Sequence, residues 1–325
     1  LATGMDVLRC LRRVVVLGLA VVLLVAGTPG RVANSAQPRV VAILYPETRA
    51  PYRQIFADIL SGIEQGLTEV TVRTYPLPES PDVAAVRRWL AQLSPAVVIT
   101  LGRIATESYA ATGLKIPQVI GALNASPQTQ PQVAGVSLAV DPALLFDTLQ
   151  VLSPATQRIW VVFNPVHDRW LIELAQRAAA ARHLTLRPLE ATNLRAAVQQ
   201  FLHILNTADS ATDALWLVAD AGVVDPEAVL PVLIEQSWHR RLALFSNSLQ
   251  HAQRGVLFAL YPDNIPLGRR LAELTLRILR THDPTLDIEP LRAVKRVLNL
   301  KVAAHLELSI TQGIERQFDL VLPPW

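Results

Sequence analysis

The sequence predicts an α/β protein of two similar Rossmann-like lobes, each a parallel sheet flanked by helices. Short runs rich in Val, Ile and Leu alternate along the chain with longer runs whose apolar residues recur at helical spacing. The short runs are continuously apolar, as in strands that are covered on both faces. The pattern also occurs twice along the chain. Strands that alternate with helices of this length are typical of parallel sheets with helices on both faces.

The first half begins with VVAILYP, a β-branched run bounded by proline, and ends with a helix that starts after Asp141. Asp82 predicts the N-cap of one helix, and Gly113 predicts the end of another. The expected strands are 40–46, 70–76, 96–102, 116–123 and 133–140, and the other expected helices are 52–67, 82–93 and 103–113.

The second half repeats the order of the first. VVAILYPETRAPYRQIF corresponds to IWVVFNPVHDRWLIEL, AVVITLG to ALWLVAD, and IPQVIGAL to LALFSNS. The correspondence predicts two lobes of the same kind in one chain. The expected strands are 158–165, 185–191, 214–221, 242–248 and 254–262, and the expected helices are 168–184, 193–207, 225–241 and 268–280.

Residues 1–36 differ from the rest and predict a secretory signal peptide. A basic head precedes an apolar stretch at 14–27 and a run of small residues. An uncleaved N-terminal membrane anchor is the alternative. The leader holds Arg9, Arg12, Arg13 and Arg31 against Asp6, which accounts for the whole formal net charge of +3. The remaining chain is near neutral, so the basic footprint of a nucleic-acid-binding protein is missing.

The composition also argues against several kinds of site. The only cysteine, Cys10, lies in the leader, so no disulfide or thiolate metal site is expected. The histidines lack metal-binding spacing, and no phosphate-binding glycine motif follows the first strand. GVSLA resembles part of a nucleophile elbow at Ser137, but it fits better as a strand. We therefore expect no cofactor, no metal and no enzymatic activity.

Ligands of open α/β sheets bind beyond the carboxyl ends of the strands, where helix N-termini also lie. Two lobes that face each other across such edges would form a cleft for a small molecule. Tyr261 is added because a family resemblance implies that the chain returns to the first lobe there, where the residue would serve the hinge or the cleft. The predicted ligand-binding residues are Tyr45, Gly102, Arg103, Asn124, Asn164, His167, Asp220, Ser246, Asn247 and Tyr261.

Structural explanations compete with ligand binding at several positions. Asn164 precedes proline and would form a turn. Asp168 is expected to cap a helix. Asp220 would either meet an amino group of a ligand or cap a helix, and Tyr45 would either stack on a ligand or pack at the rim. Arg103 would pair with a ligand carboxylate or form a surface salt bridge.

Several segments occur in a characteristic order and spacing: PAVVITLGRIATES, VAGVSL, LSPATQRIWVVFNP, LVADAGVVDP and VLNLKVAAHLEL. Together they resemble the ABC transporter substrate-binding family, which includes proteins assigned to tryptophan and tyrosine import and has the type I periplasmic binding protein fold. The resemblance extends from about Pro38 to Ile310, and it rests on order and spacing, since no single motif is specific.

The resemblance implies a monomeric periplasmic protein that captures a small molecule between hinged lobes and delivers it to an ABC permease. An amino acid or a related metabolite is the suggested ligand. A sensor of the same fold that signals to a membrane protein is the alternative. The implied first lobe is 38–137 plus 258–290, and the second is 138–257 plus 291–325.

Two segments depart from the family pattern. Gly102-Arg103 stands where the family commonly has Gly-Thr, and Asn124 begins NASP where the family often has Asp-Pro. Both lie at expected cleft positions, so the ligand can differ from that of better-known members.

Overall fold

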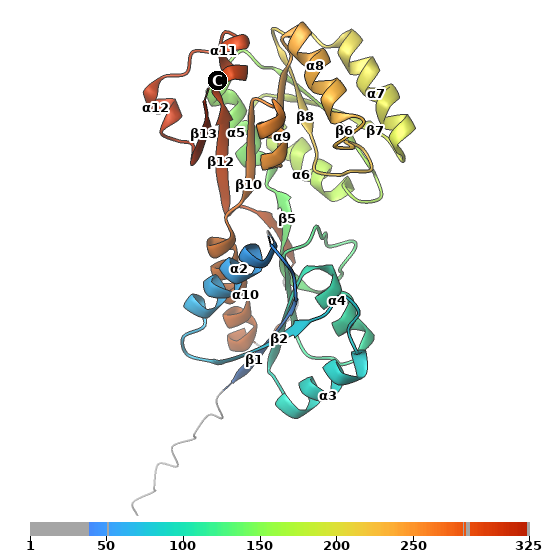
Figure 1. Ribbon diagram of the computed structural model, residues 1–325, viewed down its shortest axis with the longest axis vertical. Coiled ribbons are helices and arrows are strands. Elements are labelled where there is room, and N and C mark those ends of the chain that lie inside the picture. The colour runs from blue at the N-terminus through green and yellow to red at the C-terminus, as the bar shows by residue number, and fades with distance from the viewer. Residues whose placement is uncertain (1–38, 51, 282, 284–286, 324–325) are drawn as a thin grey trace, which may run out of the picture. The chain divides into compact units, whose positions relative to one another are not determined.

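A computed structural model describes residues 39–50, 52–281, 283 and 287–323. The expected signal peptide, residues 1–36, lies outside the described residues. Within them, no helix is both long enough and apolar enough to cross a membrane. The described chain forms two sheets, each with helices packed on it (Figure 1).

The first sheet has six strands, all in parallel pairs, in the order β11-β5-β4-β3-β1-β2. Its strands are β1 (Val40–Pro46), β2 (Thr71–Leu77), β3 (Val97–Leu101), β4 (Gln118–Gly121), β5 (Ala134–Val140) and β11 (Ile288–Leu291). Its helices are α2 (Tyr52–Gly66), α3 (Val83–Leu93), α4 (Gly102–Ala111) and α10 (Asn264–Thr281).

The sequence of strand β1 is continuously apolar because helices cover both faces of the strand. Val41 and Ile43 pack in one core cluster with residues of α2 and α10, whereas Ala42 and Leu44 pack in another with residues of α3 and α4. Because successive side chains of a strand point to opposite faces, both faces of β1 are covered. Asp82 caps α3 as expected and accepts hydrogen bonds from two backbone amides.

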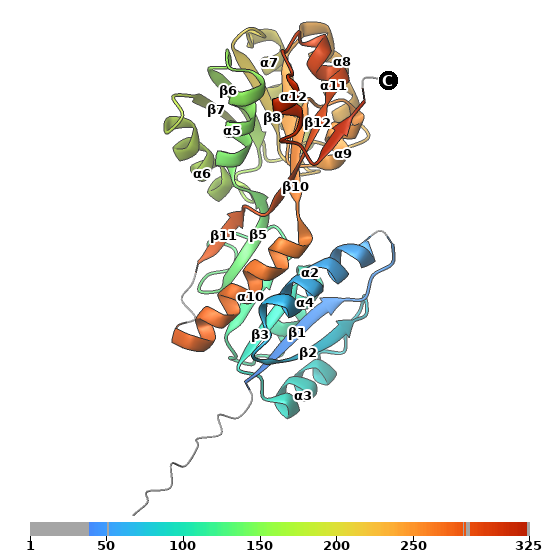
Figure 2. The same cartoon turned by 90° about the vertical axis from the view of Figure 1, so that its left-hand side faces the viewer.

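Helices α2 and α10 are far apart in sequence but lie side by side on one face of the first sheet (Figure 2). A Cβ atom on Gly62 would lie 2.1 Å from the carbonyl oxygen of Ile265, and one on Gly268 would lie 2.1 Å from that of Ile59. The two glycines therefore let the helix backbones touch. This contact holds α10 on the first sheet after the chain has left the second.

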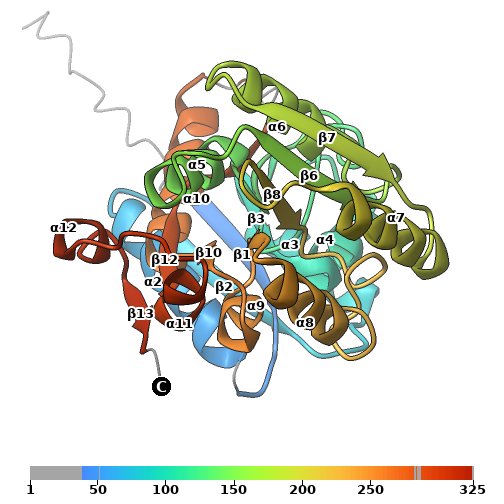
Figure 3. The same cartoon turned by 90° about the horizontal axis from the view of Figure 1, so that it is seen from above.

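The second sheet has seven strands in the order β13-β12-β10-β9-β8-β6-β7, and only β10 and β12 pair antiparallel. Figure 3 shows β6 and β7 running side by side. The strands are β6 (Arg158–Phe163), β7 (Thr185–Glu190), β8 (Asp213–Leu217), β9 (Ala243–Ser246), β10 (Phe258–Pro262), β12 (Val294–Asn299) and β13 (Leu320–Leu322). The helices are α5 (Pro142–Leu152), α6 (Arg169–Ala180), α7 (Leu194–Thr207), α8 (Leu230–Arg240), α9 (Leu249–Arg254), α11 (Leu300–His305) and α12 (Gln312–Glu315).

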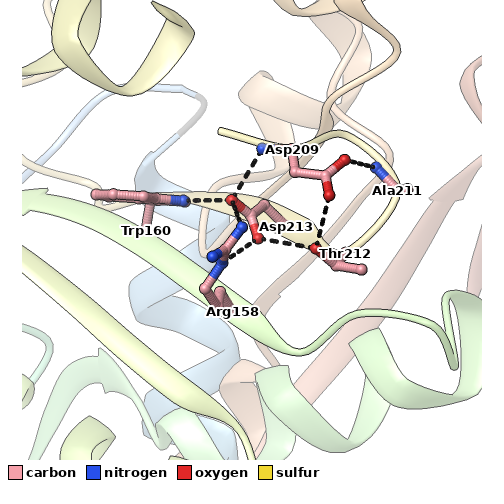
Figure 4. A network of polar contacts seen from close by, with 6 residues as sticks. All are labelled: Arg158, Trp160, Asp209, Ala211, Thr212 and Asp213. Carbon is pink, nitrogen blue, oxygen red and sulfur yellow. Dashed lines mark hydrogen bonds and ion pairs between the residues drawn. The ribbon is translucent and has the colours of Figure 1, made fainter. Parts of the chain in front are cut away.

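A buried carboxylate ties together the N-terminal ends of β6 and β8 (Figure 4). The side chain of Asp213 is fully buried and accepts two hydrogen bonds from the Arg158 guanidinium, at 2.6 and 3.1 Å. It also accepts from Trp160 Nε1 at 2.9 Å and from the backbone N–H of Asp209 at 3.0 Å. Thr212 Oγ1 lies 3.3 Å from its Oδ1. Both carboxylate oxygens are therefore satisfied.

The predicted fold class, two mainly parallel sheets flanked by helices, is confirmed. The chain passes between the sheets after β5, β10 and β11. Residues 258–262, which the family resemblance places in the first lobe, pair with β9 and β12 and so belong to the second sheet. Residues 138–140, assigned to the second lobe, lie in β5 of the first sheet. The lobe boundaries themselves stay a prediction.

Candidate ligand-binding site

A pocket of about 770 Å³ collects residues from both sheets at the ends where their strands finish. Helix α2 forms one wall, and the segment after β9 forms another. The lining residues are Tyr52, Ile55, Phe56, Asp58, Ile59, Ala122, Asn124, Leu138, Ala219, Asn247, Ser248, Leu249, Gln250, Tyr261, Pro262, Asp263, Asn264, Ile265 and Lys295.

The α2 wall of the pocket is apolar and accessible. Tyr52 is 61% exposed and Ile55 is 37% exposed, and Phe56 lies beside them. Tyr52 and Ile55 thus expose apolar surface although they belong to an otherwise amphipathic helix, whereas Phe56 packs partly against the core. Ligand pockets are lined in this way, with an apolar surface and a few polar groups.

Polar atoms without partners lie at the C-terminal edge of the second sheet. Among the described residues, Asp168 Oδ2, Asp220 Oδ2 and Asn247 Oδ1 are buried and have no hydrogen-bond partner. Asp220 uses its other oxygen to accept from Gly222 N at 2.8 Å. A buried carboxylate oxygen without a partner is unfavourable, and native structures normally satisfy such groups. These atoms are therefore acceptors without a donor from the chain; Asn247 lines the 770 Å³ pocket, whereas Asp168 and Asp220 are not among its lining residues.

Asp168 stands at the N-cap position of α6 but makes no capping hydrogen bond, contrary to the expected role. Its φ of −110° and ψ of 0° differ from the extended backbone of an effective N-cap. Burial, followed by the nearby charge of Asp220, raises the pKa of Asp168 to about 6. A hydrogen bond with the backbone of Asn164 and the charge of His167 act in the opposite direction.

Three of the predicted site residues, Asn124, Asn247 and Tyr261, line the pocket. Asp220 directly follows the lining residue Ala219. Ser246 lies behind the pocket wall, fully buried, and donates to Leu217 O at 2.9 Å. Their roles in ligand binding stay predictions.

Three further predicted residues lie elsewhere or have partners of their own. Tyr45 lines a different pocket, of about 1110 Å³, beyond the ends of β1 and β2. Arg103 is 78% exposed and pairs with Glu107 at 3.7 Å, the surface salt bridge offered as its alternative. Asn164 Oδ1 accepts from Val166 N at 3.0 Å, which is a turn interaction.

The last two predicted residues are Gly102 and His167. Gly102 begins α4 with a φ of +79°, a conformation that favours glycine, and a Cβ there would lie 3.6 Å from the Phe56 ring. His167 is exposed in the turn before α6. Neither residue lines the 770 Å³ pocket.

Sequence reasoning missed Tyr52, Ile55, Phe56 and Lys295. The helix in 52–67 was expected, but its exposed apolar residues follow the same spacing as its core residues. Lys295 pairs with Asp263 across 3.9 Å in the pocket wall, and nothing in the sequence joins these two positions. No group of three or more His, Cys, Asp or Glu in the described part of the chain could hold a metal ion.

Comparison with known proteins gives a consistent result. The family model described as ABC transporter substrate binding protein matches residues 57–319. No curated protein matches.

Three solved structures share the fold. One is an ABC domain from Streptococcus pneumoniae in complex with L-Trp, with a TM-score of 0.57, 16% identity, and coverage of 88% of this chain and 100% of that one. A ligand-free, open substrate-binding protein with adhesive properties from Clostridium difficile has a TM-score of 0.63, 13% identity, and coverage of 87% and 99%. A periplasmic ribose ABC transporter from Conexibacter woesei has a TM-score of 0.51, 11% identity, and coverage of 87% and 98%. The type I periplasmic binding protein fold is thereby confirmed.

Proposed function

Because this chain belongs to the ABC transporter substrate-binding protein family, we propose that it captures a small molecule bearing a protonated amine and delivers it to an ABC permease. The resemblance drawn from the order of its segments is confirmed by the family match. The amine, the delivery step and the permease are our inference.

The three unpaired acceptors of Asp168, Asp220 and Asn247 carry the proposal. An ammonium group has three N–H donors and no acceptor, so it complements two carboxylate oxygens and an amide oxygen in both charge and hydrogen bonding. A ligand carboxylate or phosphate at the same place would instead add like charge to the two aspartates. The acceptors therefore favour a cationic group over an anionic one.

The α2 wall supports an apolar part of the same ligand. Tyr52, Ile55 and Phe56 offer an aliphatic and aromatic surface on which a ring or a branched chain can pack. Amino acids and related amines combine these features, as does the L-Trp that the Streptococcus pneumoniae structure contains. We therefore choose L-tryptophan as the first probe.

Capture by such a protein requires no chemical step. A ligand that contacts both lobes would favour the closed arrangement by its higher affinity for it. Ser137, the serine of the partial nucleophile motif, is fully buried, and its Oγ accepts from the backbone N–H of Ala125 and Ala139. We propose a periplasmic, monomeric binding protein without catalytic activity.

A thermal-shift screen tests the proposal with matched pairs of compounds. L-Tryptophan is compared with indole-3-propionate, which keeps the ring and the carboxylate but lacks the amine, and other amino acids, amines, nucleobases and small acids complete the screen. A ligand at a hundred times its dissociation constant adds about 2.7 kcal/mol to stability. We expect shifts from amine-bearing compounds only. Shifts from deaminated analogues or acids alone would contradict the cationic ligand.

A further inference from the structure

A buried serine–histidine contact lies behind the wall of the candidate site. Ser246 ends β9 and is fully buried, and His251 in α9 is 8% exposed. Ser246 Oγ lies 2.7 Å from His251 Nδ1 and donates to the carbonyl oxygen of Leu217 at 2.9 Å. The backbone N–H of Ser248 donates to the same oxygen at 3.2 Å.

The capacity of a hydroxyl group fixes the direction of these bonds. A serine hydroxyl has one hydrogen to donate and two lone pairs to accept. Its hydrogen is directed to Leu217, so Ser248 N–H and His251 Nδ1–H must be the two donors. His251 therefore carries its proton on Nδ1, and the bonding capacity of Ser246 Oγ is fully used. Burial, together with the charge of Arg254, lowers the pKa of His251 to about 4, so the ring is neutral at neutral pH.

These bonds connect two of the second-sheet segments that reach the pocket, the end of β8 and the segment after β9. Leu217 ends β8, two residues before the lining residue Ala219 and three before Asp220. Ser248 lies in the segment 247–250, all four residues of which line the pocket. One hydroxyl thus joins the β8 end, the segment 247–250 and helix α9.

We propose that His251 is a positioning residue for ligand binding: its ring holds Ser246 so that segment 247–250 and the end of β8 keep the spacing that the ligand requires. The inference rests on the proposed function as far as the ligand is concerned. Without the ring donor, only the bonds to Leu217 O and from Ser248 N–H hold Ser246 Oγ, so the segment samples other arrangements more often. If the binding arrangement is populated only about a tenth of the time, the apparent dissociation constant rises about tenfold.

The test compares His251→Leu with His251→Asn in the full chain. The asparagine amide can supply an N–H donor close to the position of Nδ1, whereas leucine cannot. The first measurement needs no ligand: hydrogen exchange of the Ser248 amide, compared with amides of the core strands. The second is the dissociation constant of L-tryptophan, or of the amine that gives the largest thermal shift.

His305→Leu is the matched control. It removes another histidine hydrogen bond of the second sheet's helices, from His305 Nε2 to the carbonyl oxygen of Trp238 at 2.8 Å, and His305 does not line the candidate site. We expect His251→Leu to speed Ser248 exchange about tenfold more than core exchange and to raise the dissociation constant about tenfold. Asparagine should restore both, and the control should change neither.

The inference is overturned if Ser248 exchange in His251→Leu follows the core amides, or if His305→Leu has the same effect on Ser248. It is also overturned if Ser248 exchange rises while amine affinity is unchanged. If no amine binds the wild-type protein, the cationic ligand fails, while the exchange data still decide whether His251 holds the segment.

Discussion

Buried carboxylates at the two ends of the second sheet differ in whether their oxygens have hydrogen-bond partners. Where β8 begins, the oxygens of Asp213 accept hydrogen bonds from Arg158, Trp160 and a backbone amide (Figure 4). Where the chain leaves β8, Asp220 keeps one buried oxygen without a partner, and Asp168 after β6 does the same. The same strands thus carry a completed network at one end and open acceptors at the other.

The pKa values of the two ends follow this difference. Burial disfavours the charge of Asp213, but hydrogen bonds from Arg158, Trp160 and the backbone outweigh it and lower its pKa. Burial and the nearby Asp220 charge instead raise the pKa of Asp168 to about 6. A completed network stabilises the folded chain, whereas open acceptors destabilise it until a partner binds. We therefore assign the first end to stability and the second to ligand recognition.

The largest expected effect is on folding, from Asp213→Ala. The substitution leaves the buried Trp160 N–H without its acceptor and breaks a partly buried ion pair, so the free energy of unfolding should fall by about 3 kcal/mol. Urea denaturation measures this loss. Amine affinity of the folded fraction should stay within about twofold of the wild type, since additivity holds for distant sites. A large affinity loss at unchanged stability would reverse the assignment of the two ends.

Asp220→Asn should lower ligand affinity without lowering the stability of the fold. The asparagine keeps an oxygen for Gly222 N–H but removes the charge, so amine affinity should fall about 100-fold, as for other buried charged contacts. The free energy of unfolding should not fall, because an unsatisfied buried charge is removed. Calorimetric titration and urea denaturation measure the two quantities. A loss of stability like that of Asp213→Ala would show that Asp220 is a structural residue.

Asp168→Asn tests the pH dependence of binding. Protonation of Asp168 near its pKa of about 6 removes a negative charge, so wild-type amine affinity should fall about tenfold between pH 7 and pH 5. Asp168→Asn should bind about tenfold more weakly at pH 7 and show little dependence over that range. Titration calorimetry across the range measures both. Equal pH profiles for the two proteins would exclude Asp168 from binding.

The same pKa shift has the opposite sign for the stability of the ligand-free protein. The folded chain holds the Asp168 proton up to about pH 6, whereas the unfolded chain releases it near 3.8. The folded state therefore binds more protons between these values, and its stability should decrease as the pH rises through them. Urea denaturation at a series of pH values measures this decrease in the free energy of unfolding. Asp168→Asn should remove the part of the decrease that Asp168 causes.

Arg103→Ala should have the smallest effect. Its ion pair with Glu107 is exposed, and such pairs contribute about 0–1 kcal/mol. We expect a change in the free energy of unfolding below about 0.5 kcal/mol and unchanged amine affinity. An affinity loss would show that Arg103 contacts the ligand, as first predicted from its place in the sequence.

The sequence predicted the fold because its strands are covered on both faces and so read as continuous apolar runs. Val41 to Leu44 in β1 is one example, and the expected cap at Asp82 is another. The return of α10 to the first sheet was predicted only through the family resemblance. Its close contact at Gly62 and Gly268 depends on residues about 200 positions apart, which local patterns cannot reveal.

The site was harder to predict because its residues differ from structural ones only in their partners. Asp82 and Asp168 both precede helices, yet only Asp82 has the extended backbone that lets its carboxylate cap. Asp213 and Asp220 lie close together in sequence, yet only Asp213 meets an arginine from a neighbouring strand. Tyr52 and Ile55 follow core-like spacing and prove exposed.

The proton balance of amine binding at pH 6 tests the central claim most directly. Calorimetric titrations in buffers of different ionisation enthalpy count the protons released as the amine binds. Asp168 is about half protonated at this pH, so a bound cation should release roughly half a proton per ligand from the wild-type protein and none from Asp168→Asn. Proton uptake, or equal release from both proteins, would contradict recognition of a cation by these open carboxylates.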